Sequence, residues 1–137
     1  MTPRDDVMRR IFEESETIAV VGASSNPDRA GHYIPAYLKG RGYKIVPVNP
    51  NHDEVLGERC YDSLEDIPFP VDAVEVFRRP EHTPEVARQA VAIGAKALWL
   101  QLGISNDEAR RIAEEGGLLY VEDECMGPQH RRLLRAS

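Results

Sequence analysis

The sequence predicts an α/β protein with one doubly wound domain, in which a five-stranded parallel sheet has helices on both faces. Three observations predict this fold class. Five short runs of β-branched and apolar residues recur along the 137 residues, and segments with apolar residues at helical spacing separate most of them. Strands that alternate with helices are typical of parallel βαβ units. No linker or change of composition divides the chain, so we expect a single domain over residues 1–137.

The first elements follow from the apolar pattern. An amphipathic helix is expected at about residues 3–15, and a buried strand at residues 17–22, where a continuous apolar run ends in glycine. The next helix ends at the glycines of residues 40–42. Because Pro35 cannot donate the hydrogen bond of a helix interior, we expect this helix to begin only around His32, after a loop of about nine residues.

The alternation then repeats to the end of the chain. The remaining strands are expected at residues 43–48, 72–77, 97–102 and 118–123. Helical segments are expected after Ser63, at residues 84–94, at residues 105–115 and after Pro128. Ser63 is interpreted as a helix cap, and Ser105 with Glu108 as a capping box. This order of elements predicts a Rossmann-like fold with right-handed crossovers.

Composition excludes several classes of function. The net charge of −6 argues against a broad nucleic-acid surface, and no apolar run approaches the length of a membrane span. The N-terminus lacks the pattern of a signal peptide, so we expect a cytoplasmic protein. Cys60 and Cys125 suggest neither a disulfide framework nor a metal cluster. The four histidines are scattered without metal spacing, and no nucleophile or P-loop motif occurs. We expect no metal site and no catalytic residues, and catalysis is left open.

A ligand site is expected beyond the carboxyl ends of the strands. After the first strand, Gly22 permits a tight turn, and the small residues behind it let backbone amides approach a phosphate at a helix N-terminus. Arg29 adds a positive charge to this loop. The full G-x-G-x-x-G fingerprint is absent, so a plain strand-to-helix turn is the alternative.

The next two loops narrow the choice of nucleotide. An NAD-binding domain places an acid after the second strand to bind the ribose, whereas this chain has Asn49 and Pro50. A ribose with a phosphate, as in coenzyme A or NADP, is not repelled there. Arg78 and Arg79 follow the third strand, where they either contact phosphate or form ion pairs. Phe77 either covers an adenine or completes the core.

The loop after the fifth strand contains Cys125. This loop could bring the thiol near a bound thiol and allow a mixed disulfide. The alternative is an inert, buried cysteine, and the three preceding acids, at residues 122–124, are expected to disfavour its thiolate.

Several long motifs resemble one family. They are VVGASSNPDRAGHYIPAYLKGRGYKIVPVNP at residues 20–50, VDAVEVFRRPEHTPEV at 71–86, GAKALWLQLGISNDEA at 94–109, and Cys125 with the HRRL segment at 130–133. The chain resembles the small CoA-binding proteins, which are similar to the N-terminal domain of the succinyl-CoA synthetase α subunit. The resemblance implies a Rossmann-like CoA-binding fold, with the diphosphate at residues 22–26 and the nucleotide end bordered by residues 49–50.

The resemblance also implies that residues 77–80 and 101–103 complete the wall of the site. The expected cofactor-binding residues are Gly22, Ala23, Ser24, Ser25, Asn26, Arg29, Asn49, Pro50, Phe77, Arg78, Arg79, Pro80, Gln101 and Gly103. The phosphohistidine domain of the synthetases has no counterpart here, so ligase activity is not implied. Family members often have Asp-Arg-Cys near the end, where this chain has Glu124 before Cys125, which weakens a phosphate role for that loop.

We therefore expect a protein that binds coenzyme A or an acyl-CoA as a non-catalytic carrier, sensor or store. Two alternatives are an NADP-dependent oxidoreductase that uses the same cleft and a regulatory subunit that reports CoA to a protein partner.

Overall fold

A five-stranded parallel sheet organises the computed structural model, which describes residues 2–134. Its strands are β1 (Thr17–Val21), β2 (Lys44–Val48), β5 (Ala73–Val76), β6 (Ala97–Leu100) and β7 (Leu119–Val121). They lie in the order β2-β1-β5-β6-β7, and all four pairings are parallel. Each strand falls inside a predicted apolar run, because strands buried on both faces need apolar residues at nearly every position.

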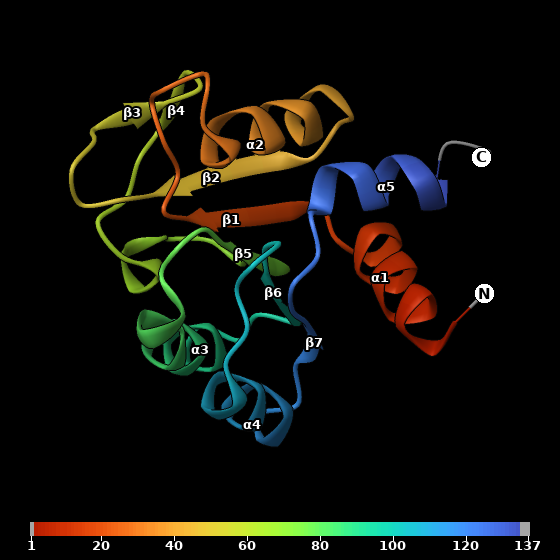
Figure 1. The fold of residues 1–137 in the computed structure, drawn as a ribbon. Coiled ribbons are helices and arrows are strands. Elements are labelled where there is room, and N and C mark those ends of the chain that lie inside the picture. The colour runs from red at the N-terminus through yellow and green to blue at the C-terminus, as the bar shows by residue number, and fades with distance from the viewer. Residues whose placement is uncertain (1, 135–137) are drawn as a thin grey trace.

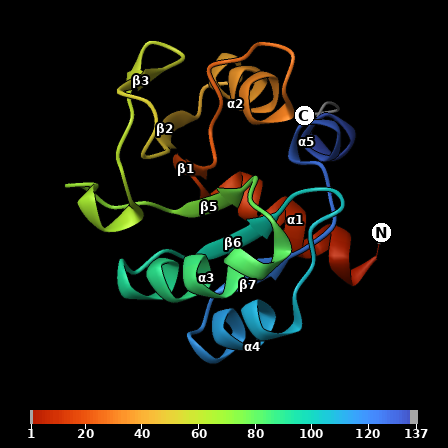
Figure 2. The same ribbon diagram turned by 60° about the vertical axis from the view of Figure 1, so that its left-hand side comes forward.

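Five α-helices cover both faces of the sheet (Figure 1). They are α1 (Pro3–Glu14), α2 (Ala30–Gly40), α3 (Thr83–Ala92), α4 (Asp107–Glu115) and α5 (Met126–Leu134). Side chains of α1, α2 and α5 form one core with the sheet, and side chains of α3 and α4 form the other. Figure 2 shows the sheet with α2 and α5 above it and α3 and α4 below. The doubly wound α/β prediction is confirmed.

Short elements complete the fold. A small antiparallel pair, β3 (Glu54–Val55) and β4 (Glu58–Arg59), follows β2 and was not predicted, because its sequence has no apolar alternation. Two 3-10 turns, η1 (Leu64–Asp66) and η2 (Pro80–His82), lie on either side of β5 along the chain. No helix among residues 2–134 is both long enough and apolar enough to cross a bilayer.

Three helix starts differ from the sequence predictions. Helix α2 begins at Ala30, two residues earlier than expected, and contains Pro35. The cap of α4 is Asn106, whose side chain accepts from the Ala109 amide at 2.9 Å, and not Ser105. Helix α5 begins two residues before Pro128, which occupies its first turn, where a missing N–H costs nothing.

The turn after Ser63 forms, but the predicted serine cap does not. The Ser63 hydroxyl makes no capping bond to the backbone, and instead donates to the Asp66 carboxylate at 3.2 Å.

Candidate functional site

The strand order reverses between β1 and β5. The helix after β1, α2, packs on one face of the sheet, and the helix after β5, α3, packs on the other. In open parallel sheets this arrangement leaves a crevice at the carboxyl ends of the two central strands. By this rule we expect the crevice between residues 22–29, which follow β1, and residues 77–79, which follow β5.

Gly22 occupies a position that only glycine can fill. Its φ is +87°, in the left-handed region, and its amide donates to the Val48 carbonyl at 2.9 Å. A Cβ at this position would lie 2.4 Å from the Phe77 carbonyl oxygen. The turn after β1 therefore packs directly against the backbone that follows β5, as the tight-turn prediction required.

Gly31 and Pro35 together fix the loop onto α2. Pro35 has no N–H for the carbonyl of Gly31, four residues before it, and the Ser24 amide donates to this carbonyl instead, at 3.1 Å. A Cβ on Gly31 would lie 2.9 Å from the Gly22 carbonyl oxygen. The proline is thus compatible with the helix interior because the loop takes the hydrogen bond that the proline cannot make.

Polar side chains in the loop stabilise its shape. The Ser24 hydroxyl accepts from the Asn26 amide at 3.0 Å, and the Asn26 side chain accepts from the Asp28 amide at 3.0 Å. His32 Nδ1 lies 2.8 Å from the Ser24 carbonyl oxygen. These are local turns of the serine and asparagine kind, so two of the expected cofactor-binding side chains contribute to the conformation of the loop.

Free backbone amides gather where the loop meets α2. The cap residue of this helix, Arg29, makes no side-chain cap, and its first turn has no acid. In contrast, α1 and α4 have both a side-chain cap and acids in the first turn. Among residues 2–134, no hydrogen bond to a protein acceptor is found for the amides of Ala23, Ser25, Ala30 and Gly31. An uncapped helix N-terminus of this kind suits an anion.

Three cations at the crevice have no acidic partner. Arg29, Arg78 and Arg79 form no ion pair within residues 2–134. The Arg78 side chain lies over the turn, with its Cδ 3.2 Å from the position of a Cβ on Gly22. Of the two interpretations of Arg78 and Arg79, the structure gives no support to ion pairing, and both guanidinium groups are available to an anionic ligand.

A pocket of about 200 Å³ opens beside Arg78 on the α3 face of the sheet. Its lining is Val21, Val48, Pro50, Asp62, Ser63, Arg78, His82, Glu85, Val86 and Gln89. The ends of β1 and β2 form its apolar floor, and α3 contributes one wall. Two expected residues, Pro50 and Arg78, line it.

Asn49 connects the end of β2 to the loop at residues 22–29. Its side-chain amide donates to the Ala23 carbonyl at 2.9 Å, and its side-chain oxygen accepts from the Asn51 amide at 2.9 Å. The Cys60 thiol donates to the Asn49 carbonyl at 3.4 Å, and burial raises the pKa of this thiol. Asn49 therefore positions the loop, and Cys60 is part of the packing beneath it.

The other expected residues lie at the same edge of the sheet. Phe77 is half-buried against the core and contacts Gly31, with its ring Cγ 3.7 Å from the position of a Cβ there. Pro80 is exposed at the start of η2. Gln101 is buried, and both ends of its side-chain amide bond within the protein. Gly103 is exposed, and its amide donates to the Asp123 carboxylate at 2.7 Å.

Comparison with known proteins matches residues 16–131 to the model of the CoA binding domain. The chain belongs to the CoA binding domain family. An uncharacterized protein of Bacillus subtilis (strain 168), YneT, is 39% identical over 128 residues, which are 93% of this chain and 95% of that protein. A hypothetical protein from Pyrococcus horikoshii OT3 is 42% identical with a TM-score of 0.92, and covers 98% of this chain and 93% of that chain.

A larger relative matches only in part. The acetate–CoA ligase (ADP-forming) II of Archaeoglobus fulgidus is 35% identical over 101 residues, which are 72% of this chain and 15% of the ligase. The CoA-binding domain described here therefore corresponds to a small part of that enzyme.

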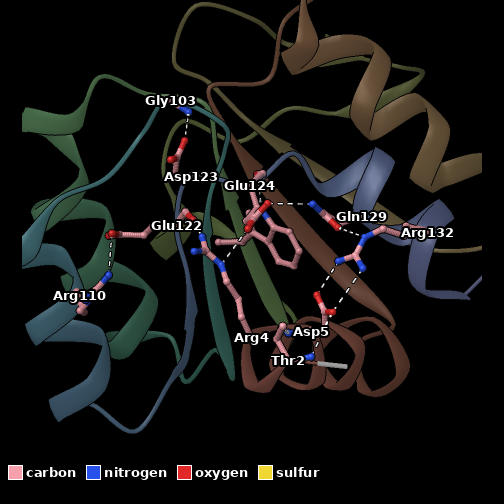
Figure 3. Close-up of polar contacts among 11 residues, drawn as sticks. Thr2, Arg4, Asp5, Gly103, Arg110, Glu122, Asp123, Glu124, Gln129 and Arg132 are labelled. Carbon is pink, nitrogen blue, oxygen red and sulfur yellow. Dashed lines mark hydrogen bonds and ion pairs between the residues drawn. The ribbon is translucent and has the colours of Figure 1, made fainter.

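The acids before Cys125 in this CoA-binding domain are all engaged by partners (Figure 3). Arg110 forms an ion pair with Glu122 at 2.7 Å, and Arg4 forms one with Glu124 at 2.9 Å. The Gly103 amide donates a hydrogen bond to the Asp123 carboxylate at 2.7 Å. Asp123 has a φ of +57°, and its amide also donates to the Ile104 carbonyl at 3.0 Å. Arg4 of α1 thus neutralises Glu124 in this loop.

Sequence reasoning missed Glu75 at the centre of β5. This side chain is 0% exposed, and burial raises the pKa of its carboxyl to about 8. Its Oε2 accepts from Gln101 Nε2 at 2.8 Å, while its Oε1 has no hydrogen-bond partner. A single carboxylate inside a continuous apolar strand is the signal that could have found it, because such a group is rarely buried without a role.

Proposed function

We propose that this protein binds coenzyme A or an acyl-CoA in the crevice at the carboxyl ends of β1 and β5, as a non-catalytic carrier, sensor or store. The observation on which the proposal depends is the uncapped N-terminus of α2, with its free amides beside the turn at Gly22. The diphosphate would bind to these amides, as anions do at helix N-termini.

The unpaired arginines support the same placement. The diphosphate and the ribose phosphate of coenzyme A are both anionic. Because the protein has a net charge of −6, it must attract them through a local cluster of positive charge. Arg29 lies at the N-terminus of α2, and Arg78 lies between the turn at Gly22 and the pocket of about 200 Å³. The pocket, with Pro50 at its rim, is the place we propose for the nucleotide end.

The absence of an acid at the position directly after β2 favours a ribose that bears a phosphate. Asn49 occupies the position at which NAD-binding domains have a carboxylate, and its side chain is already bonded to the loop. Both coenzyme A and NADP satisfy this condition, and membership of the CoA binding domain family favours coenzyme A.

Calorimetric titration with coenzyme A, 3′-dephospho-coenzyme A and NADPH tests the proposal. We expect saturable heat with coenzyme A, weaker binding without the ribose phosphate, and weaker or no binding of NADPH. Tighter binding of NADPH than of coenzyme A would replace the proposal with the oxidoreductase alternative. No heat with any of the three would remove the nucleotide site.

A matched pair of charge reversals tests the location. Arg29→Glu places an acid at the free amides of α2, so we expect the affinity for coenzyme A to fall by about tenfold or more, in line with loss of a charge-assisted contact. Arg111→Glu makes the same charge change on an exposed residue of α4, on the other face of the sheet, and should leave affinity within about twofold. Equal losses in both variants would argue against the site.

The non-catalytic role has its own test. An acyl-CoA incubated with the protein should be recovered chemically intact, because no catalytic constellation is found among the crevice residues. Turnover of the thioester, measured by release of free thiol above the rate in buffer, would contradict a carrier, sensor or storage role.

A further inference from the structure

Strand β7 forms one edge of the sheet, and within residues 2–134 no strand pairs with its outer side (Figure 1). The Leu119 amide donates to the Lys96 carbonyl at 2.9 Å, and the register pairs Val121 with Trp99. In a strand of a parallel pair, alternate residues direct their backbone groups to the same neighbour. Leu119 and Val121 therefore face β6, and the N–H and C=O of Tyr120 point outward, away from the sheet.

The opposite edge of the sheet, at β2, is covered by the chain itself. The Tyr61 amide donates to the Pro47 carbonyl at 3.0 Å, and the Asn49 amide donates to the Tyr61 carbonyl at 2.9 Å. Pro47 has no N–H to leave unpaired. Proteins protect their sheet edges because an uncovered edge pairs with other chains. The outer side of β7 has no such backbone cover, which makes it a candidate for pairing.

A hollow of about 270 Å³, here called the edge pocket, lies on the outer side of β7 between α1 and α4. Its lining is Pro3, Arg4, Val7, Arg110, Glu114, Tyr120, Val121 and Glu122. Arg4 limits the pocket at one end, because its guanidinium donates to the outward-pointing carbonyl of Glu122 (Figure 3). The backbone groups of Tyr120 therefore lie at the part of the edge that a second strand can reach.

The α4 wall of the edge pocket has one charge of each sign. Arg110 and Glu114 lie four residues apart, on the same side of the helix. Arg110 pairs with Glu122 at 2.7 Å, whereas Glu114 is exposed and forms no ion pair within residues 2–134. A two-fold rotation about Tyr120 would bring Glu114 of each copy toward the other copy's Arg110. The charges of this surface are therefore complementary to themselves.

We propose that the outer edge of β7 is an interface between two copies of this chain, which pair as antiparallel strands about a two-fold axis at Tyr120. Opposite residues in a hydrogen-bonded antiparallel pair exchange both of their N–H···O bonds. The N–H and C=O of Tyr120 in each copy would thus be satisfied by the same residue of the other. Two five-stranded sheets would join into one continuous sheet, flanked by two ion pairs between Glu114 and Arg110.

This interface is separate from the proposed coenzyme A site. The crevice lies at β1 and β5, and β6 stands between β5 and β7. The inference therefore does not depend on the proposed function. Calorimetric titration of coenzyme A should give the same affinity, within about twofold, for the wild type and for a variant that no longer dimerises.

Sedimentation equilibrium between micromolar and millimolar protein concentrations measures the association. We expect a reversible dimer of the wild type. Glu114→Arg replaces two attractions by two repulsions, and should raise the dissociation constant by about tenfold or more. Glu65→Arg makes the same charge change at an exposed position outside the edge pocket, and should change it by less than about twofold. A wild type that stays monomeric, or equal effects of both variants, would overturn the proposal.

A charge swap tests the pairing of the two side chains directly. Arg110→Glu should also weaken the dimer, because it places two acids opposite two acids. When Arg110→Glu and Glu114→Arg are mixed, each interface has two acids on one copy and two arginines on the other. The heterodimer should then exceed both homodimers in native mass spectra, with circular dichroism to verify that each variant is folded. A mixture without excess heterodimer would contradict the proposed contacts.

Amide hydrogen exchange, resolved by residue, locates the interface without any substitution. The Tyr120 amide should exchange fast at concentrations where the monomer prevails and slowly where the dimer prevails. The Leu119 amide is the matched control, because it donates to Lys96 within the chain and should be protected in both conditions. A dimer in which exchange at Tyr120 does not change with concentration would have its interface elsewhere, and the proposal would be wrong.

Discussion

Replacing Glu75 by glutamine should change how the stability of this protein depends on pH. In the folded protein, burial raises the pKa of the Glu75 carboxyl from 4.5 to about 8. Between these two values the unfolded chain releases the proton, while the folded protein keeps it. The free energy of unfolding of the wild type therefore falls as pH rises through this window. Below it both states are protonated, and above it both are ionised, so the contribution is constant outside it.

The size of the effect follows from the shift. One pKa unit corresponds to about 1.4 kcal/mol, so the wild type should lose about 5 kcal/mol from this group between pH 4.5 and 8. No discount for solvent screening applies, because the side chain is 0% exposed. Glutamine has a similar shape, can still accept from Gln101 and does not titrate. The stability of the variant relative to the wild type should therefore increase by about 1.4 kcal/mol per pH unit across the window.

Urea unfolding of both proteins, followed by circular dichroism at several pH values between 4.5 and 8, measures this difference. Glu65→Gln, at an exposed position of the η1 turn, controls for the loss of one acid. Parallel stability curves for wild type and Glu75→Gln would refute the reasoning, because they would mean that Glu75 titrates alike in the folded and unfolded chain.

Three further predictions concern the crevice. Gly31→Ala forces a Cβ to 2.9 Å from a backbone carbonyl, and should lower the free energy of unfolding by about 1–3 kcal/mol and weaken coenzyme A binding. Gly40 lies in the same helix, and a Cβ added to it would meet no atom within 4 Å, so Gly40→Ala should raise the free energy of unfolding by up to about 1 kcal/mol. Similar changes in the two variants, measured by urea unfolding, would contradict the close approach at Gly31. Asn49→Ala removes two hydrogen bonds and should lower the free energy of unfolding by about 1–3 kcal/mol. Asn51→Ala removes neither side-chain bond and should leave this free energy nearly unchanged when both variants are compared by urea unfolding. Finally, added salt should weaken binding of coenzyme A more than that of pantetheine, because only the former has phosphates to be screened; calorimetry that shows equal sensitivity would argue against phosphate recognition.

The sheet could be predicted from the sequence because its strands are short apolar runs whose identity hardly depends on the rest of the structure. Helix starts were less predictable, since they depend on which of several capable side chains caps the helix. Ser105 and Asn106 are both good caps, and the structure uses Asn106, whose side chain also donates to the Pro80 carbonyl at 3.1 Å. The start of α2 was misplaced for a different reason. The rule against interior proline holds for an isolated helix, but here a loop amide uses the carbonyl that Pro35 cannot serve.

The positions of the loops at the carboxyl ends of the strands could be predicted from the sequence, whereas the contacts of their side chains could not. Gly22 and Arg29 could be chosen because the turn and the charge are local properties. The hydrogen bonds from Asn49 to Ala23 and from Gln101 to Glu75 join residues that lie more than 20 positions apart in the sequence. No local sequence pattern reveals such contacts. Glu75 was overlooked because a charged residue inside an apolar run was interpreted as part of the strand alone.

The bond between the Ser24 amide and the Gly31 carbonyl has a thermodynamic consequence. A loop already tied to its helix through the backbone has few conformations left to lose when a ligand arrives. Association should therefore proceed without a slow rearrangement, and the unliganded and liganded backbones at this turn should coincide to within about 1 Å. The affinity would then depend mainly on the dissociation rate of the ligand, and not on the population of a binding-competent conformation of the protein.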